Sequence, residues 1–341
     1  MAEPEKVEEN MSLNDMKDMM DRNLALEVVR VTEAAALAAS KLVGRGDKMA
    51  ADQVAVDAMR HALNSLHIKG RIVIGEGERD EAPMLYIGEE VGSGNGPEID
   101  IALDPLEGTD ITAAGGPNAL AVVAMTDKGG FLNAPDTYMQ KMAIGPGLDP
   151  NILDLDAPIG DVLAKLAKEK GGSINDLNVC ILDRPRHQDI ITGVREAGAR
   201  ITLIGDGDVS AVIATAEPDT GIDLYVGTGG APEGVLGAAA LQCIGGSMLG
   251  RLIFRNDTEK ARAEKWGITD LNRIYTTDDL AKGDNVMFAA TGVTDGTMLR
   301  GVRRYAGGAK TSSIIMRSKS GTVRRVEATH NFKRKDWIKA I

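Results

Sequence analysis

The stretch Ile101-Ala-Leu-Asp104-Pro-Leu-Glu107-Gly-Thr109 decides the fold of the first half of this sequence. An apolar run from Ile99 to Leu103 predicts a buried strand. Pro105 is expected to end this strand, and Gly108 permits a sharp turn after it. The sequence therefore predicts that two carboxylates and one hydroxyl are presented together at the end of a buried strand.

The three polar side chains of this stretch, Asp104, Glu107 and Thr109, indicate a chemistry. Carboxylates on a tight turn contribute little to a hydrophobic core, but they hold a hard divalent cation such as Mg²⁺ or Mn²⁺ well. The Thr109 hydroxyl could orient a water molecule for attack, or it could merely cap the following helical turn. We therefore expect metal-assisted hydrolysis of a phosphate ester.

Composition narrows the class of protein. A chain of 341 residues is long enough for two domains or one large one, and its 40 glycines with 3% aromatic residues suit a turn-rich α/β protein. The net charge of −11 argues against a nucleic-acid-binding face, although local arginines can still bind a small anion. No apolar stretch is long enough to span a membrane. Cys180 and Cys243 lie in separate apolar runs, as expected for core thiols in a reducing compartment.

The first part of the chain is predicted to be an arm followed by helices and strands. Residues 1–21 are polar, and we interpret them as a mobile arm, although methionines at helical spacing leave an oligomer contact as the alternative. The elements predicted next are helices over Arg22–Val43 and Ala51–Leu66 and strands over Arg71–Ile74 and Ala119–Met125.

From about Leu177, apolar runs of strand length alternate with helical patterns. The predicted strands are Val179–Leu182, Ile201–Ile204 and Ile222–Val226, and the helices are His187–Ala197, Val209–Ala216 and one that begins near Pro232. This series predicts a parallel sheet with helical crossovers. A Gly and Pro cluster suggests a boundary, so that residues 22–155 form a metal-binding α+β domain and residues 156–341 a mostly parallel-sheet α/β domain. Residues 285–325 alternate as further strands.

Polar clusters follow the strands of this second half, which is where open parallel sheets bind ligands. The clusters are Asp183-Arg184-Pro185-Arg186-His187, Asp206-Gly207-Asp208 and Gly227-Thr-Gly-Gly230-Ala-Pro-Glu233-Gly. Two arginines in one loop suit a phosphate group. The glycines before Pro232 let backbone N–H groups approach an anion at a helix start, and Glu233 in that first turn is a potential metal ligand.

Each of these clusters also has a purely structural interpretation. Asp-Gly-Asp is commonly a turn with a helix cap, an Arg-Pro-Arg loop is usually solvated, and Gly75-Glu76-Gly77-Glu78 alone is usually a turn. Asp52 alone is a favoured residue near a helix start. Because all of them fall at strand ends or helix starts, we favour a single site. Four histidines lack metal-ligand spacing and remain unassigned: His61, His67, His187 and His330. Phosphate-loop, dinucleotide and nucleophile-elbow motifs are absent from the sequence.

The chain resembles class II, GlpX-type fructose-1,6-bisphosphatases of the lithium-sensitive sugar phosphatase superfamily, from about Arg22 to the C-terminal region. The stretches that carry the resemblance are Gly44-Arg-Gly-Asp-Lys48, Val73-Ile-Gly-Glu-Gly-Glu78, Glu81-Ala-Pro-Met-Leu-Tyr86, Asp104 to Thr109, Asp183-Arg-Pro-Arg-His187, Gly207-Asp-Val209, Gly229-Gly-Ala-Pro-Glu-Gly234 and Lys319-Ser-Gly-Thr322. The resemblance implies a layered α/β sandwich of the sugar phosphatase type and a cytoplasmic homodimer or homotetramer.

The implied reaction is metal-dependent hydrolysis of the 1-phosphate of D-fructose 1,6-bisphosphate, a step of gluconeogenesis. The resemblance assigns two or three Mg²⁺ or Mn²⁺ ions to Asp52, Glu76, Asp104, Glu107 and Glu233. It assigns catalysis to Thr109 with Asp104 and Glu107, and it places Lys48 close to the metal cluster. The implied substrate contacts are Glu107, Gly108, Thr109, Tyr138, Arg184, Pro185, Arg186, Asp206, Gly207, Asp208 and Gly230.

Two other functions stay open at this point. Sedoheptulose 1,7-bisphosphate could replace or accompany the fructose substrate without a change of mechanism. A non-catalytic sugar-phosphate sensor is a more remote alternative, because a sensor would not need the complete acidic set together with Thr109.

Overall fold

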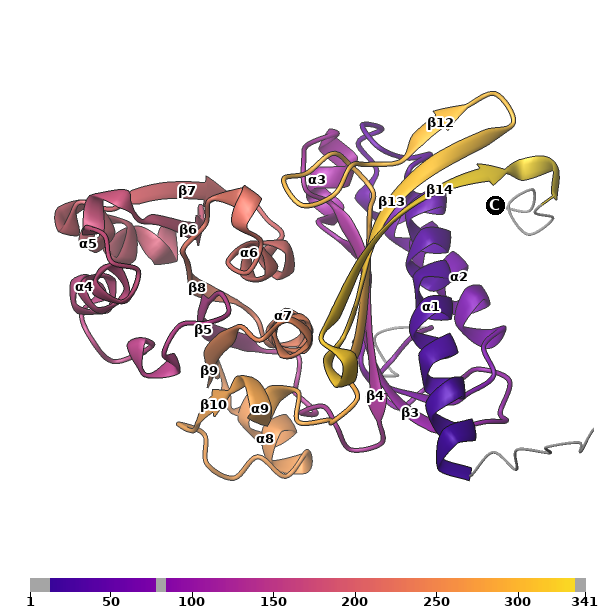
Figure 1. Ribbon diagram of the computed structural model, residues 1–341, viewed down its shortest axis with the longest axis horizontal. Coiled ribbons are helices and arrows are strands. Elements are labelled where there is room, and N and C mark those ends of the chain that lie inside the picture. Colours follow the sequence, from indigo (N-terminus) through magenta and orange to yellow (C-terminus); the bar gives the residue numbers. More distant parts are fainter. Residues whose placement is uncertain (1–12, 78–83, 335–341) are drawn as a thin grey trace, which may run out of the picture.

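The computed structural model describes residues 13–77 and 84–334. Within these ranges the chain forms an eight-stranded sheet and a six-stranded sheet, with helices on both sides of each (Figure 1). Helical layers and sheets alternate across the molecule, which confirms the expected layered α/β sandwich. The predicted turn at Glu78 and the matching stretch that begins at Glu81 lie partly outside the described residues.

The eight-stranded sheet contains the strand that carries Asp104. Its strands are β1 (Lys69–Ile74), β2 (Glu90–Val91), β3 (Glu98–Glu107), β4 (Leu120–Asp127), β11 (Met287–Gly292), β12 (Arg303–Tyr305), β13 (Gly308–Arg317) and β14 (Thr322–Asn331). Their order is β12-β13-β11-β4-β3-β1-β2, and β14 also pairs with β13. β1 is parallel to β3, whereas β3, β4, β11 and β13 follow one another as antiparallel neighbours.

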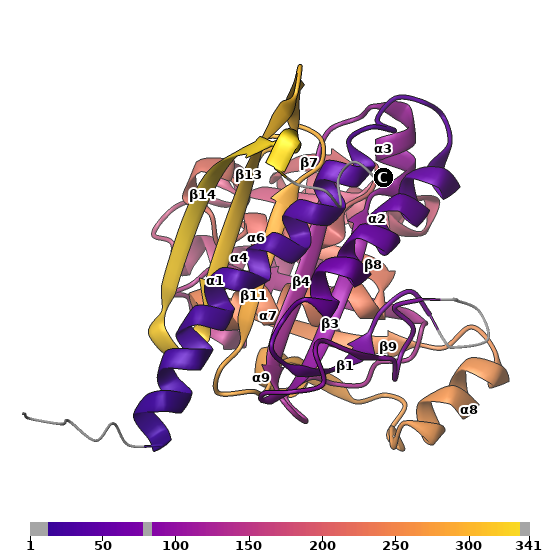
Figure 2. The ribbon, with the colours of Figure 1, turned by 90° about the vertical axis from the view of Figure 1, so that its right-hand side faces the viewer.

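Two helices, α1 (Leu13–Ala39) and α2 (Lys48–Asn64), cover one face of this sheet side by side (Figure 2). Val28 of α1 and Met59 of α2 are fully buried against apolar strand residues such as Ile101. The first helix begins well before the predicted Arg22, so the second part of the expected arm is helical, and residues 1–12 lie outside the described residues. Asp47 caps α2, because its side chain accepts a hydrogen bond from the Ala50 N–H at 2.9 Å.

The C-terminal strands belong to the first sheet, which corrects the predicted domain division at residue 155. Strands β11 to β14 were expected in the second domain, but β11 pairs with β4 on one edge and β13 on the other. Every residue of β11 is buried, so this strand needs partners on both edges and cover on both faces. The alternating pattern predicted the strands correctly, but such a pattern does not specify which sheet a strand joins.

The structure also corrects the expectation that Pro105 ends its strand. β3 continues to Glu107, and its pairing with β4 shifts register between Asp104 and Glu107. Proline cannot donate a ladder hydrogen bond, and such an irregularity in register is a place where a strand tolerates it. The strand therefore delivers Asp104 on one side of the irregularity and Glu107 on the other.

The six-stranded sheet is mixed. Its strands are β5 (Tyr138–Ile144), β6 (Asn178–Leu182), β7 (Arg200–Ile204), β8 (Leu224–Gly230), β9 (Ser247–Ile253) and β10 (Ile274–Thr276), in the order β10-β9-β5-β8-β6-β7. The strands of the predicted parallel series, β6, β7 and β8, are parallel to one another in it. β5 lies between β8 and β9 and is antiparallel to both. The expected mostly parallel sheet is thus only half right.

The helices around this sheet form the outer and central layers. They are α4 (Ile159–Glu169), α5 (Gln188–Ala197), α6 (Asp208–Ala214), α7 (Ala231–Ile244), α8 (Asp257–Lys265) and α9 (Thr277–Leu280). α7 lies between the two sheets and contacts strands of both (Figure 1). Its sequence is mainly small and apolar, and most of its residues are fully buried, as a helix between two sheets requires. Among the described residues, no helix has the length and apolar character needed to cross a membrane.

Candidate active site

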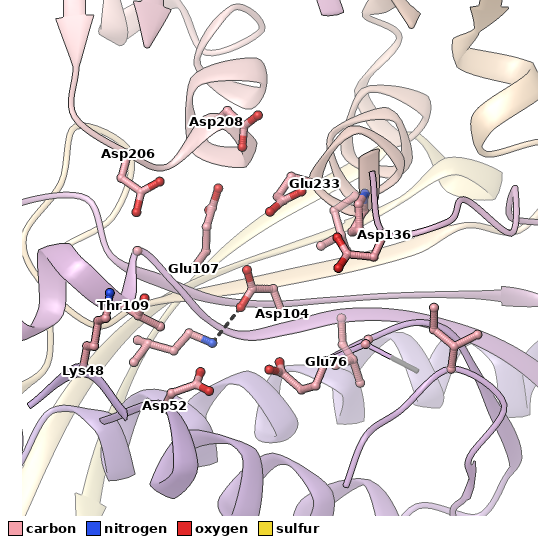
Figure 3. Close-up of a pocket in the computed structure, with 18 of the residues that line it drawn as sticks. Lys48, Asp52, Glu76, Asp104, Glu107, Thr109, Asp136, Asp206, Asp208 and Glu233 are labelled. Carbon is pink, nitrogen blue, oxygen red and sulfur yellow. Dashed lines mark hydrogen bonds between the residues drawn. The ribbon is translucent and has the colours of Figure 1, made fainter. Parts of the chain in front are cut away.

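Acidic side chains from the elements around both sheets line one cavity of about 370 Å³ (Figure 3). The sequence-predicted site residues that line it are Lys48, Asp52, Glu76, Asp104, Glu107, Gly108, Thr109, Asp206, Asp208 and Glu233. In Figure 3, Asp52 and Glu76 lie on one side of the cavity, and Asp206, Asp208 and Glu233 lie on the other. The structure thus brings together residues from five separate parts of the sequence.

The end of β3 and the turn after it place three of these residues. Asp104 is fixed by its own backbone surroundings, because its Oδ1 accepts the Leu106 N–H at 2.9 Å. Gly108 has φ of 87°, a left-handed conformation that glycine adopts without strain. Thr109 then begins the short helix α3 (Thr109–Ala114), and Gly108 rather than Thr109 occupies the cap position. The sharp turn predicted from Gly108 is therefore present.

The helix that follows β7 holds Glu107 from the opposite sheet. The backbone N–H of Val209, in the first turn of α6, donates to Glu107 Oε1 at 2.7 Å. Glu107 is buried, and this bond joins the end of β3 to the start of α6 across the interface between the sheets. The position of Glu107 therefore depends on the packing of both halves of the molecule.

The remaining residues of the first half reach the cavity from a helix and a strand end. Asp52 lies in the second turn of α2, and Glu76 follows β1. Lys48 begins α2 and forms an exposed ion pair with Asp110 at 3.0 Å. An exposed pair contributes little to stability, so Lys48 can change partner at little cost.

Burial is the main cause of a raised pKa at the carboxyl groups of Asp52, Glu76, Asp104, Glu107, Asp206 and Glu233. Burial and the negative charges of Asp52 and Glu233 raise the pKa of Glu76 to about 8. Burial followed by the charge of Asp208 raises the pKa of Glu233 to about 7. The pKa values of Asp104 and Glu107 lie well above their usual range. Burial and mutual repulsion thus make the ionised form of these carboxyl groups unfavourable in the cavity. A bound cation would offset that cost.

Two buried carboxylate oxygens are available to bind a cation. Oε2 of Glu107 and Oε2 of Glu233 are buried and accept no hydrogen bond from any described residue. Buried polar atoms normally have a partner. Within residues 13–77 and 84–334, no three acidic, imidazole or thiol groups form a ready-made metal site. An all-oxygen donor set suits a hard divalent ion.

Several predicted substrate residues do not line this cavity: Tyr138, Arg184, Pro185, Arg186, Gly207 and Gly230. Arg186 instead donates from Nε and Nη2 to the Thr228 carbonyl oxygen at 2.9 and 2.6 Å. Its guanidinium carbon lies 5.1 Å from the centroid of the Tyr138 ring, and that of Arg255 lies 4.7 Å from the same centroid. These residues form a second, basic group beside the strand end of β8.

Sequence reasoning missed two residues at the site, Asp136 and Lys141. Asp136 lines the cavity, but it precedes β5 without any distinctive motif. Lys141 is fully buried in β5, forms an ion pair with Asp208 and donates from Nζ to the Gly230 carbonyl oxygen at 2.9 Å. A lysine in the middle of an apolar strand is a detectable signal, because a buried ammonium group requires a partner.

We expect Lys141→Met to lower the free energy of unfolding by about 3–5 kcal/mol, because it leaves the Asp208 carboxylate buried without its partner. Denaturant unfolding of the purified variant measures this change. The double variant Lys141→Met/Asp208→Asn should recover part of the loss, because no unpaired charge remains. A single variant as stable as the parent chain would show that the pair does not contribute to stability.

Comparison with known proteins gives matches over nearly the whole chain. The family model described as bacterial fructose-1,6-bisphosphatase, glpX-encoded, matches residues 22–330. A fructose-1,6-bisphosphatase 1 class 2 from Escherichia coli K12 is 48% identical over 330 residues, which cover 93% of this chain and 98% of that protein. Proteins named fructose-1,6-bisphosphatase class 2 from Escherichia coli O6:H1 and Shigella flexneri match with the same identity and coverage. A solved structure of an extragenic suppressor from Pyrococcus furiosus covers 57% of this chain and 70% of its own, but its TM-score of 0.30 and 13% identity carry no argument.

Proposed function

Because the chain belongs to the bacterial, glpX-encoded fructose-1,6-bisphosphatase family, we propose that it hydrolyses the 1-phosphate of D-fructose 1,6-bisphosphate to fructose 6-phosphate and phosphate. The observation that carries this proposal is the cavity that Thr109 lines together with carboxylates from both halves of the molecule. A sugar phosphate is an anion, and an acidic cavity accepts it only together with cations.

The residues we propose as metal ligands are Asp52, Glu76, Asp104, Glu107 and Glu233, and the proposed cofactor is two or three Mg²⁺ or Mn²⁺ ions. When bound, these ions would neutralise the phosphate oxygens and lower the pKa of a nearby water molecule. The Oε2 atoms of Glu107 and Glu233 support this assignment, since they are buried carboxylate oxygens that accept no hydrogen bond from the described residues.

The proposed role of the chain in the chemical step is to hold and orient the attacking water. Thr109 Oγ1 accepts a hydrogen bond from this water and passes a proton toward the neighbouring carboxylates. The Val209 N–H donates to Oε1 of Glu107 and so fixes this carboxylate. Oε2 accepts no hydrogen bond from the described residues and is left for a cation. No phosphorylated side chain is needed, because the water attacks phosphorus in line with the leaving oxygen.

The proposed contacts to the far phosphate and the sugar hydroxyls are Tyr138, Arg184, Pro185, Arg186, Asp206, Gly207, Asp208 and Gly230. Support comes from the basic group formed by Arg186 and Arg255 at the Tyr138 ring. Arg186 uses Nε and Nη2 on Thr228, so its Nη1 is the atom we assign to a phosphate oxygen. The chain is further proposed to act as a cytoplasmic homodimer or homotetramer.

We expect Arg186→Ala to raise KM about 10- to 100-fold, which corresponds to the loss of a charged hydrogen bond of about 1.5–3 kcal/mol. The non-reacting phosphate carries a similar charge in the ground and transition states, so kcat should change little. Steady-state kinetics decide this. Arg195→Ala, at an exposed position near the end of α5, is the matched control. A collapse of kcat at unchanged KM would instead place Arg186 at the reacting phosphate.

The substrate is tested by phosphate release from fructose 1,6-bisphosphate, sedoheptulose 1,7-bisphosphate and inositol monophosphate in the presence of Mn²⁺. The proposal expects the highest kcat/KM for fructose 1,6-bisphosphate. A higher value for the seven-carbon bisphosphate would favour the sedoheptulose alternative. Binding of these sugars without any phosphate release would favour the sensor.

A further inference from the structure

We propose that His187 is a positioning residue for substrate binding, because its imidazole joins the Asp183–His187 loop to the end of β8. The proposal rests on the proposed function, in which Arg184 and Arg186 of this loop bind the far phosphate. His187 showed no recognisable role in the sequence. In the structure His187 is 1% exposed, although its two neighbours in the sequence, Arg186 and Gln188, are exposed.

Both ring nitrogens of His187 have a backbone partner. Nδ1 lies 2.8 Å from the Leu182 carbonyl oxygen, and Nε2 lies 2.8 Å from the Thr228 backbone nitrogen. A carbonyl oxygen can only accept and a backbone N–H can only donate. The ring must therefore carry its proton on Nδ1 and keep Nε2 unprotonated, which defines a neutral imidazole in one tautomer. Burial, together with the charge of Arg186, lowers the pKa of His187 and favours the same neutral form.

Three hydrogen bonds to the Thr228 backbone, one with His187 and two from Arg186, replace a missing strand neighbour. Backbone pairing between β6 and β8 ends at Cys180 and Tyr225, whereas β8 continues to Gly230. Beyond this point, His187 accepts from the Thr228 N–H and Arg186 donates to the Thr228 carbonyl oxygen. Side chains of the loop thus complete the hydrogen bonding of the strand.

The residue before Thr228 allows this approach. A Cβ atom added to Gly227 would lie 3.3 Å from His187 Cε1, which is tighter than most Cβ contacts and would require the ring to shift slightly. On its other edge, β8 pairs with β5 as far as Gly230 opposite Tyr138. The end of β8 therefore links the arginine loop on one edge to Tyr138 on the other, and His187 fixes that link.

Two substitutions separate the two bonds of the ring. In His187→Gln, the longer amide can place its oxygen where Nε2 lies and accept the Thr228 N–H. In His187→Asn, the shorter amide can replace only Nδ1, so the Thr228 N–H is left unpaired. We expect KM for fructose 1,6-bisphosphate, and Kd for fructose 6-phosphate by calorimetry, to stay within about 3-fold of the parent in the Gln variant and to rise about 10-fold in the Asn variant. The value of kcat should stay within about 2-fold in both, because the ring does not line the acidic cavity.

A second measurement does not depend on the variants folding. Nitrogen-15 NMR of the histidine rings in the unaltered chain should show one neutral ring protonated on Nδ1 at neutral pH, and the Gln variant should lack that signal. Equal KM and Kd values for the Gln and Asn variants, or a ring protonated on Nε2, would overturn the inference. If the parent binds fructose 6-phosphate but does not hydrolyse the bisphosphate, the proposed function fails, and the two Kd values still decide the role of His187.

Discussion

Asp104→Asn is expected to abolish phosphate release while the protein remains folded. Asp104 lies on β3 between the other acidic groups. Burial is the main cause of its raised pKa, and the charges of Glu76 and Glu233 raise the pKa further. The amide keeps an oxygen for the Leu106 N–H, so the local backbone should not change. It lacks the negative charge that a divalent ion requires. Because metal-assisted stabilisation is worth several kcal/mol, kcat should fall by at least about 10³-fold.

Although Asp104→Asn should lower activity, it should not lower the stability of the folded protein. A carboxyl group whose pKa is raised by folding destabilises the folded state at pH values above its unfolded pKa, so its removal should stabilise the cation-free protein at neutral pH. Without added cation, the melting temperature of Asp104→Asn should equal or exceed that of the parent chain. Addition of Mn²⁺ should raise the melting temperature of the parent and not that of the variant.

Glu98→Gln is the matched control for this prediction. Glu98 begins the same strand, but it lies at the opposite end and pairs with Lys128 on the surface. Its kcat should equal that of the parent chain. Near-normal turnover of folded Asp104→Asn at saturating Mn²⁺ would mean that Asp104 does not hold an essential cation.

Thr109→Ala is expected to lower kcat by about 10²–10⁴-fold, the usual effect of losing a positioned proton-transfer group. Thr109→Ser should retain much of the activity, because it keeps the hydroxyl. Serine lacks the methyl group that restricts χ1, so the oxygen should be held less firmly. Both kcat and the melting temperature should be measured for the two variants.

The structure weakens the main alternative for Thr109. If its hydroxyl capped α3, its loss would cost about 1 kcal/mol of stability and leave kcat unchanged. However, Gly108 occupies the cap position, and Thr109 is the first residue of the helix. An alanine variant that is fully active but melts at a lower temperature would nevertheless favour a structural role over a catalytic one.

Much of the site could be predicted because local sequence defines it. The apolar run before Asp104, the glycine that follows Glu107 and the small residues before Glu233 each indicate a strand end or a helix start. The structure brings these three carboxylates into one cavity. Their roles as metal ligands remain predictions.

What the sequence could not indicate depends on contacts between distant segments. The antiparallel insertion of β5 and the return of β11 to the first sheet depend on pairing between strands far apart in the chain. Pro105 was expected to end a strand, but the register shift accommodates it. The hydrogen bond between His187 and the Thr228 N–H joins residues 41 positions apart, and no local pattern predicts it.

The central claim is that divalent cations held by the acidic cavity allow this chain to hydrolyse fructose 1,6-bisphosphate. The most direct measurement is phosphate release by metal-stripped protein before and after addition of Mn²⁺, with fructose 6-phosphate measured in the same samples. We predict no release above the buffer background in EDTA, and equal formation of phosphate and fructose 6-phosphate once Mn²⁺ is added. Undiminished release in EDTA, or no release at saturating Mn²⁺ and substrate, would contradict the claim.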